Sequence, residues 1–167
     1  MKKRKANCIE GALFAAAALR FHGHKPLIID LTSVRDDDHI IAVFKENGYW
    51  GSIGKSKYTG LTFREPIHRT IRELAISYFE DYFNYEGEKT LRGYSRPINL
   101  KVFDKLKWMT SGDNLFFVEK YLEKINHKKL ITQKMVKNLR IVTPLAMEAG
   151  ELWMSKKGIL DKVKSKS

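Results

Sequence analysis

The chain has 167 residues, of which 43% are hydrophobic and 30% charged, as expected of one globular domain with or without a helical extension. No apolar run reaches the roughly 18 residues of a membrane-spanning helix, and the single cysteine excludes an internal disulfide and a four-cysteine zinc site, which favours a reducing compartment such as the cytoplasm. The 31 Lys and Arg residues outnumber the 19 Asp and Glu residues, and the resulting net charge of +12 attracts nucleic acid or acidic surfaces.

The first predicted element is a helix that begins at Cys8. The alanine-rich run that follows is apolar on nearly every side, which indicates a buried central helix, and Gly23 predicts its end near Phe21 or His22. A thiol in the first turn of a helix lies near unpaired backbone N–H groups, which lower its pKa. A cysteine beside alanines is also typical of a small buried residue without chemistry.

The N-terminal residues have a second interpretation. Basic residues at 2–5 before an apolar run resemble a secretory signal. Glu10 interrupts the apolar run early, and Arg20 and His22 follow it at once, so we expect a helix of the folded protein instead.

The next segments predict a β-hairpin. Residues 26–31 and 39–45 are apolar and β-branched, and each predicts a strand. Asn47-Gly48 predicts a two-residue turn, after which residues 49–56 return as a third strand. With that turn, the register places His39 opposite Ser56 at the end of the hairpin.

The rest of the chain predicts mostly helices. Pro66 is expected to open a helix whose aromatic stripe, ending at Phe83, is buried. Further expectations are a loop at 85–96, a strand at 98–102, and helices at 114–125, 132–141 and 144–158. Ser111 or Asp113, Thr132 and Thr143 are the expected caps or first residues of these helices. The predicted fold is α+β, with the alanine-rich helix on an antiparallel sheet of three or four strands. Residues 1–105 would form the core, and residues 106–167 a helical extension with a basic tail.

The order of these features resembles the transglutaminase-like superfamily, which has the papain-like cysteine fold. The likeness rests on Cys8 with the small residues after it, Leu19-Arg20 with Gly23, the strand at 27–31, His39, and Gly48-Tyr49-Trp50. It covers residues 7–58. Residues 64–82 also resemble a segment of a bacterial branch of that superfamily, for which the resemblance implies a fold but no substrate.

The resemblance implies a catalytic site. Cys8 would be the nucleophile and His39 the general base and acid. The third residue is usually an aspartate, but the matching position here is Gly54, so Ser56 is the expected third member and Asp37 the alternative. The superfamily helix is usually preceded by further structure, so we also expect the substrate cleft to lack one wall.

Three functions follow from this reading. The first is a cysteine-dependent amide-bond hydrolase or acyltransferase that acts on an unidentified peptide or amide through a Cys8 thioester. The second is a catalytically inactive protein of the same fold that binds a protein or ligand, and the third is a basic nucleic-acid-associated protein. We expect no cofactor and no membrane association, and His22 and His24 are read as a solvated loop instead of a metal site. The oligomeric state does not follow from the sequence.

Overall fold

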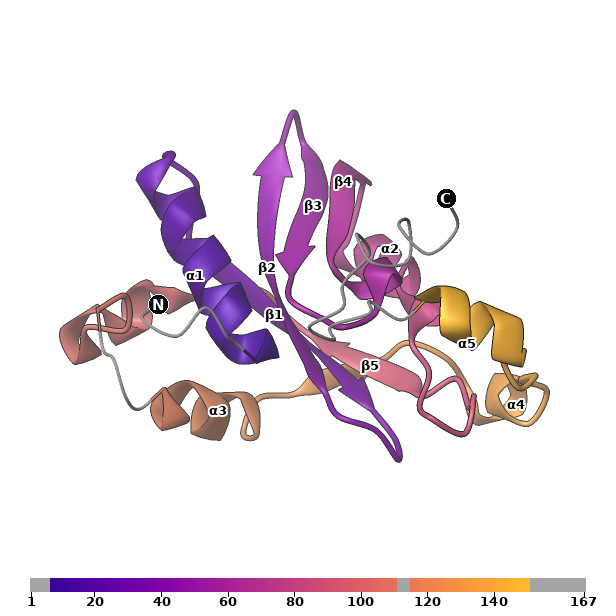
Figure 1. The fold of residues 1–167 in the computed structure, drawn as a ribbon. Coiled ribbons are helices and arrows are strands. Elements are labelled where there is room, and N and C mark those ends of the chain that lie inside the picture. Colours follow the sequence, from indigo (N-terminus) through magenta and orange to yellow (C-terminus); the bar gives the residue numbers. More distant parts are fainter. Residues whose placement is uncertain (1–6, 111–114, 151–167) are drawn as a thin grey trace, which may run out of the picture.

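The computed structural model describes residues 7–110 and 115–150, which form the α+β fold that the sequence predicts (Figure 1). The strands are β1 (Leu27–Ser33), β2 (His39–Glu46), β3 (Tyr49–Gly54), β4 (Phe63–His68), β5 (Leu91–Ser95), β6 (Ile98–Asn99) and β7 (His127–Lys129). The α-helices are α1 (Cys8–Phe21), α2 (Ile71–Ile76), α3 (Phe116–Leu122), α4 (Gln133–Val136) and α5 (Pro144–Gly150). Short 3₁₀ helices are η1 (Thr59–Leu61), η2 (Phe79–Asp81) and η3 (Leu100–Leu106).

The strands form one antiparallel sheet of seven strands in the order β4-β3-β2-β1-β5-β7, with β6 paired to β1. The sheet is therefore larger than the three or four strands expected. Its two central strands, β1 and β2, are buried on both faces, which explains their continuous apolar sequences.

Each face of the sheet carries its own apolar layer. Ile28, Ile40 and Ala42 point to the face covered by α1, η3 and α3, which we call the α1 face. Ile29 and Ile41 point to the opposite face, which is covered by α2, η2 and residues of α4. Figure 1 shows α1 and α3 on one side of the molecule and α2, α4 and α5 on the other. Because neighbouring residues of a strand point to opposite faces, a shift of one residue changes the layer that a side chain joins.

Helix α1 has the termini that the sequence predicts. Asn7 is its N-cap: the Asn7 side chain accepts a hydrogen bond from the Glu10 backbone N–H, and the Glu10 carboxylate accepts one from the Asn7 backbone N–H. The helix ends at Phe21, and Gly23 follows in the left-handed conformation with a φ of 87°. The capping box accounts for Glu10 without a role in catalysis.

The hairpin turn is also confirmed. Asn47 and Gly48 both have positive φ, 48° and 89°, as a two-residue turn of this kind requires. The predicted register holds over the whole β2–β3 ladder, from Glu46 opposite Tyr49 to Ile41 opposite Gly54. The ladder ends there.

The structure corrects the interpretation of residues 63–102. Pro66 lies in β4, at the sheet edge where a residue without an N–H is tolerated, and α2 begins only at Ile71. The aromatic residues after α2 are nevertheless buried: Tyr78, Phe79, Tyr82 and Phe83. Within the expected loop at 85–96 lies β5, and the strand expected at 98–102 is two residues long before η3 begins.

Helices α3 and α4 end earlier than expected. Thr143 caps α5 as predicted, and its hydroxyl accepts a hydrogen bond from the Ala146 backbone N–H. Thr132, expected as the first residue of its helix, is instead the N-cap of α4 and accepts one from the Met135 backbone N–H. Helix α4 spans only Gln133–Val136, and β7 was not anticipated at all. The suggested caps Ser111 and Asp113, the predicted helix end at Gly158 and the basic tail lie outside the described residues.

Candidate functional site

Cys8 lies in the first turn of α1, where the sequence places it, and its side chain is half-buried. Its thiol donates a long hydrogen bond to the backbone carbonyl of Asp38, with 3.9 Å between Sγ and O. The helix start favours a thiolate. The carbonyl oxygen of Asp38 has the opposite effect, because it accepts a hydrogen bond from the protonated thiol.

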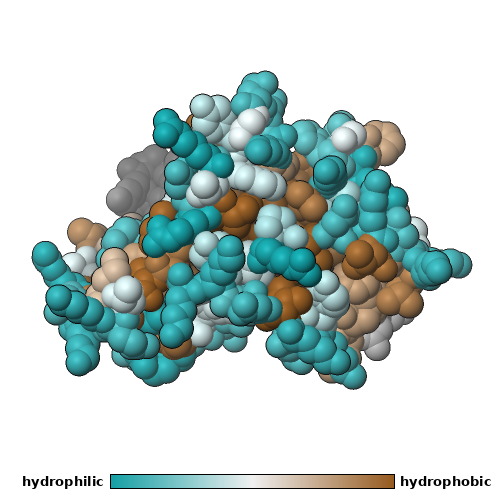
Figure 2. Space-filling view, turned by 180° about the vertical axis from the view of Figure 1, so that it is seen from behind, coloured by the Kyte–Doolittle hydropathy of each residue, from teal (hydrophilic) through white to brown (hydrophobic). Residues whose placement is uncertain are grey.

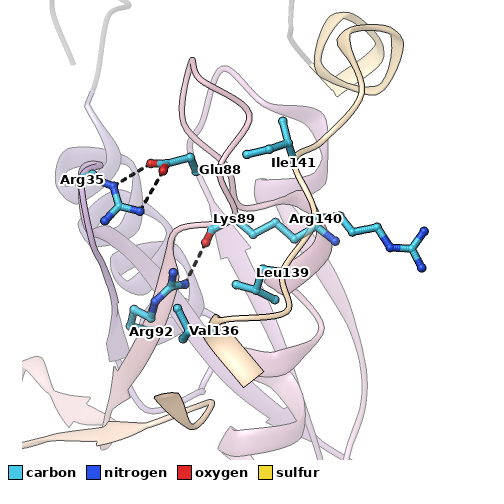
Figure 3. A pocket seen from close by; sticks show the side chains of 8 residues that line it. All are labelled: Arg35, Glu88, Lys89, Arg92, Val136, Leu139, Arg140 and Ile141. Carbon is cyan, nitrogen blue, oxygen red and sulfur yellow. Dashed lines mark hydrogen bonds and ion pairs between the residues drawn. The ribbon is translucent and has the colours of Figure 1, made fainter. Parts of the chain in front are cut away.

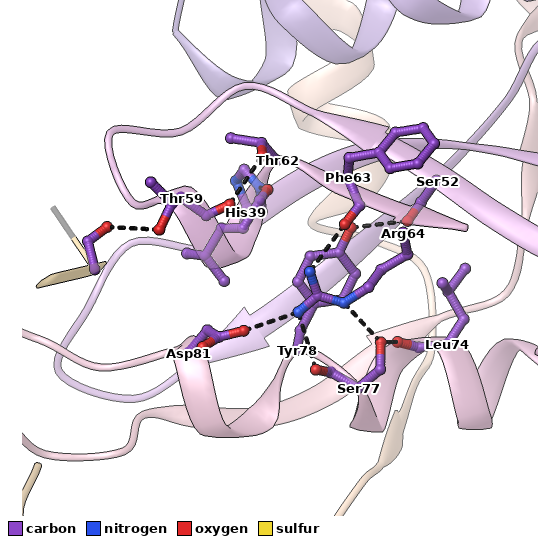
Figure 4. Close-up of polar contacts among 12 residues, drawn as sticks. His39, Ser52, Thr59, Thr62, Phe63, Arg64, Leu74, Ser77, Tyr78 and Asp81 are labelled. Atoms are coloured by element: carbon purple, nitrogen blue, oxygen red, sulfur yellow. Dashed lines mark hydrogen bonds and ion pairs between the residues drawn. The ribbon is translucent and has the colours of Figure 1, made fainter. Parts of the chain in front are cut away.

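His39 begins β2 and is only 5% exposed (Figure 4). Its Nε2 lies 3.0 Å from the backbone carbonyl oxygen of Leu61, and its ring contacts the ring of Tyr82 edge-on. Burial lowers the pKa of His39, and the hydrogen bond to Leu61 opposes that effect only in part. The imidazole is therefore neutral at pH 7 and donates its Nε2–H to Leu61.

The predicted Cys8–His39 pair is not formed. Helix α1 packs on Ile40 and Ala42, whereas His39 alternates with them and points to the opposite face, among Leu61 and Tyr82. Within the described residues, the hydrogen bond of Cys8 goes to Asp38 and that of His39 to Leu61. His39 therefore lies on the face opposite α1, although the thiol of Cys8 bonds to the carbonyl of the residue directly before it.

The expected third residues do not join His39 either. The β2–β3 ladder ends at Gly54, so Ser56 has no partner strand to hold it opposite His39, and its hydroxyl accepts a hydrogen bond from the Tyr58 backbone N–H at 3.1 Å. Asp37 lies in the loop before β2, where its backbone carbonyl accepts a hydrogen bond from the Tyr82 hydroxyl at 2.6 Å. Its side chain is exposed.

Gly54, the position that matches the superfamily aspartate, has no room for a side chain. A Cβ at Gly54 would lie 2.8 Å from the carbonyl oxygen of Leu61 and 3.0 Å from Nε2 of His39. The Leu61 carbonyl therefore occupies the place from which a carboxylate would orient the imidazole. A side chain at position 54 and the hydrogen bond from His39 to Leu61 therefore exclude each other.

The structure brings together an acid–base pair that the sequence does not indicate. Asp30 in β1 and His127 in β7 are joined by 3.0 Å between Oδ2 and Nε2, and the Asp30 backbone N–H donates to the Ser95 hydroxyl at 2.9 Å. Asp30 is 5% exposed, and its Oδ1 has no hydrogen-bond partner among the described residues. Burial, with a smaller contribution from the charge of Asp38, raises the pKa of Asp30 to about 6, and His127 opposes the rise.

Among the described residues, no hydrogen bond joins this pair to Cys8. Asp30 faces the α1 side, since it lies opposite Ile40 in the ladder, and β7 is three strands from β2 in the sheet order. The His127 side chain reaches across β5, so that its Nε2 lies beside Asp30 on β1, the strand next to β2. The sequence signal for this pair is Asp30, a carboxylate within an otherwise apolar strand, and this signal does not identify His127 as its partner.

A scan against models of known protein families finds no match to this chain, and a search of curated proteins finds no relative. Among residues 7–110 and 115–150, no helix is both long enough and apolar enough to cross a membrane. That part of the chain also holds no cluster of three or more His, Cys, Asp or Glu side chains suited to a metal ion. Of the two histidines considered for a metal, His24 packs its ring edge-on against Phe44, and His22 packs against Phe21.

Proposed function

We propose that this chain is a binding protein with a transglutaminase-like core that does not carry out cysteine chemistry. The observation that supports this proposal is that His39 points to the sheet face opposite α1, the helix that carries Cys8. A cysteine nucleophile of this kind needs its base within hydrogen-bond reach. Here His39 is hydrogen-bonded to the Leu61 carbonyl, on the sheet face opposite α1.

The surroundings of the two residues agree with this proposal. Reactive thiols have low pKa values because a cation or an imidazolium lies beside them. The hydrogen-bond partner of Cys8 is a neutral carbonyl, and the pKa of His39 is lowered, so it resists becoming the imidazolium that would stabilise a thiolate. The resemblance puts the catalytic acid at position 54, and the glycine there supplies no carboxylate that would raise the pKa of His39.

The test is the rate of Cys8 alkylation as a function of pH, in the native protein and in His39→Gln. Glutamine at 39 retains an N–H for the Leu61 carbonyl. His68→Gln is the matched control, because the ring of His68, like that of His39, bonds to a backbone carbonyl, that of Trp50, and His68 is half-buried at the end of β4. We expect the rate of alkylation to depend on pH in the same way in all three proteins.

The cysteine-dependent enzyme is the second candidate, and the place of Cys8 in the first turn of α1 is what favours it. It requires a thiol that is alkylated rapidly below neutral pH in the native protein and in His68→Gln, and slowly in His39→Gln. That result would overturn the binding proposal and would mean that the start of β2 turns His39 toward the α1 face in solution.

Nucleic-acid binding remains a prediction from the charge of +12. Figure 2 shows hydrophilic side chains spread over the face of the molecule opposite to the view in Figure 1, with separate apolar patches between them. A dispersed charge of this kind gives weak binding that depends steeply on salt. Retention on immobilised DNA or RNA at low salt, lost over a tenfold rise in salt, is the measurement that detects it.

A further inference from the structure

A pocket on the side of the sheet opposite α1 collects basic side chains from distant parts of the chain (Figure 3). It has a volume of about 120 Å³, and its basic residues are Arg35 from the β1–β2 loop, Lys89 and Arg92 around the start of β5, and Arg140 after α4. Its remaining walls are Glu88 and the apolar side chains of Val136, Leu139 and Ile141. We call these residues the basic pocket.

Carboxylates neutralise only part of this charge. Glu88 forms a two-point ion pair with Arg35, at 2.7 and 3.0 Å, and Glu80 pairs with Lys89. Arg92 donates one nitrogen to the backbone carbonyls of Lys89 and Leu91. Among the described residues, neither Arg92 nor Arg140 has a carboxylate partner, so the basic pocket keeps an excess of two positive charges.

The fold holds the Arg35 and Arg92 guanidinium groups in place. Arg35 has a φ of 54°, a conformation that costs energy for a residue with a side chain, and Asn84 donates from its side chain to both the Arg35 carbonyl and Glu88. The Arg35 side chain is exposed and paired with Glu88. Arg92 is half-buried, and its pKa is lowered by burial first and by the charge of Arg35 second. A bound anion beside Arg92 would offset both effects.

We propose that the basic pocket binds a phosphate monoester. A phosphoryl dianion matches the excess of two charges, and the free N–H groups of an arginine suit phosphate oxygens. The apolar wall formed by Val136, Leu139 and Ile141 would contact the organic part of the molecule. Arg140 lies at the rim with its guanidinium turned outward in Figure 3, where it adds charge without closing the pocket. This proposal holds whether or not Cys8 is reactive.

The experiment is calorimetric titration of the full chain with phenyl phosphate, inorganic phosphate and benzenesulfonate. Benzenesulfonate has nearly the shape of phenyl phosphate but a single charge. We expect saturable binding of one phenyl phosphate, about tenfold tighter than benzenesulfonate, and tighter than inorganic phosphate because of the apolar wall. Arg92→Gln should weaken binding at least about tenfold, and Arg140→Gln by a few fold.

Arg96→Gln is the matched control, because it removes the same charge from an exposed residue that does not line the pocket. It should change the affinity less than about twofold. Equal losses in Arg96→Gln and Arg92→Gln, or no saturable binding up to about 10 mM, would overturn the proposal. A final titration uses a short single-stranded DNA. Tighter binding of this DNA than of phenyl phosphate, weakened equally by all three variants, would overturn the proposal and assign the positive charge to nucleic-acid binding. Arg140 is exposed, so Arg140→Gln still tests the pocket if Arg92→Gln unfolds.

Discussion

Asp30 and His127 are 97 positions apart in the sequence and 3.0 Å apart in the structure, and the bond between them links β1 to β7 across β5. The second carboxylate oxygen of Asp30 is buried and unpaired within the described residues. A buried carboxylate with one free oxygen is more stable with a proton than without one. The pair therefore makes the stability of the fold depend on pH.

The first prediction concerns Asp30→Asn. Since the pKa of Asp30 is raised to about 6, the folded protein binds this proton more tightly than the unfolded chain does. The contribution of Asp30 to the free energy of unfolding is complete below about pH 4 and is lost as the pH rises through about 6, a loss of about 3 kcal/mol. Urea unfolding at several pH values between 4 and 7 should show that Asp30→Asn lacks this decrease.

The control for this prediction is Asp37→Asn, which changes an exposed carboxylate in the loop before β2. It should retain the pH dependence of the native protein. If the free energy of unfolding falls equally with pH in Asp30→Asn and in the native protein, Asp30 stays ionised across the pH range of the measurement.

The second prediction concerns Ser52 and Tyr78, whose hydroxyl groups share a buried hydrogen bond of 2.8 Å (Figure 4). Ser52→Ala leaves the Tyr78 hydroxyl unpaired and should cost about 1 to 3 kcal/mol of the free energy of unfolding. Tyr78→Phe keeps the ring that packs 4.1 Å from the Arg64 guanidinium carbon. Thermal or urea unfolding of the double variant should show a loss smaller than the sum of the two single losses. Additive losses would mean that the two hydroxyl groups do not depend on each other.

The third prediction concerns Gly54→Ala. The new methyl group would meet a backbone carbonyl and a buried histidine, neither of which can move freely, so we expect a loss of about 1 to 3 kcal/mol. Gly48→Ala is the comparison, because its methyl group meets nothing within 4 Å and its cost, about 1 kcal/mol, comes only from the left-handed backbone. Melting temperatures of both variants measure the difference. Full stability of Gly54→Ala would show that the site has space for the missing acid.

The local features of this protein could be predicted from the sequence because neighbouring residues determine them. The capped start of α1 depends on a few adjacent residues, and so does its end at Gly23. The turn at Asn47-Gly48 then determines the register of β2 against β3, since side chains in a strand alternate with a period of two.

The tertiary structure decided which distant segments pair and which face each side chain joins. β4 and β7 form the edges of the sheet, and their short or mixed sequences carry no strong strand signal because only one side of each is paired. The order of Cys8, His39 and Trp50 along the chain is the order that the superfamily shows, yet packing of α1 on Ile40 and Ala42 directs His39 away from the thiol. Order in the sequence does not specify a face of the sheet, because the face depends on where the covering helix packs.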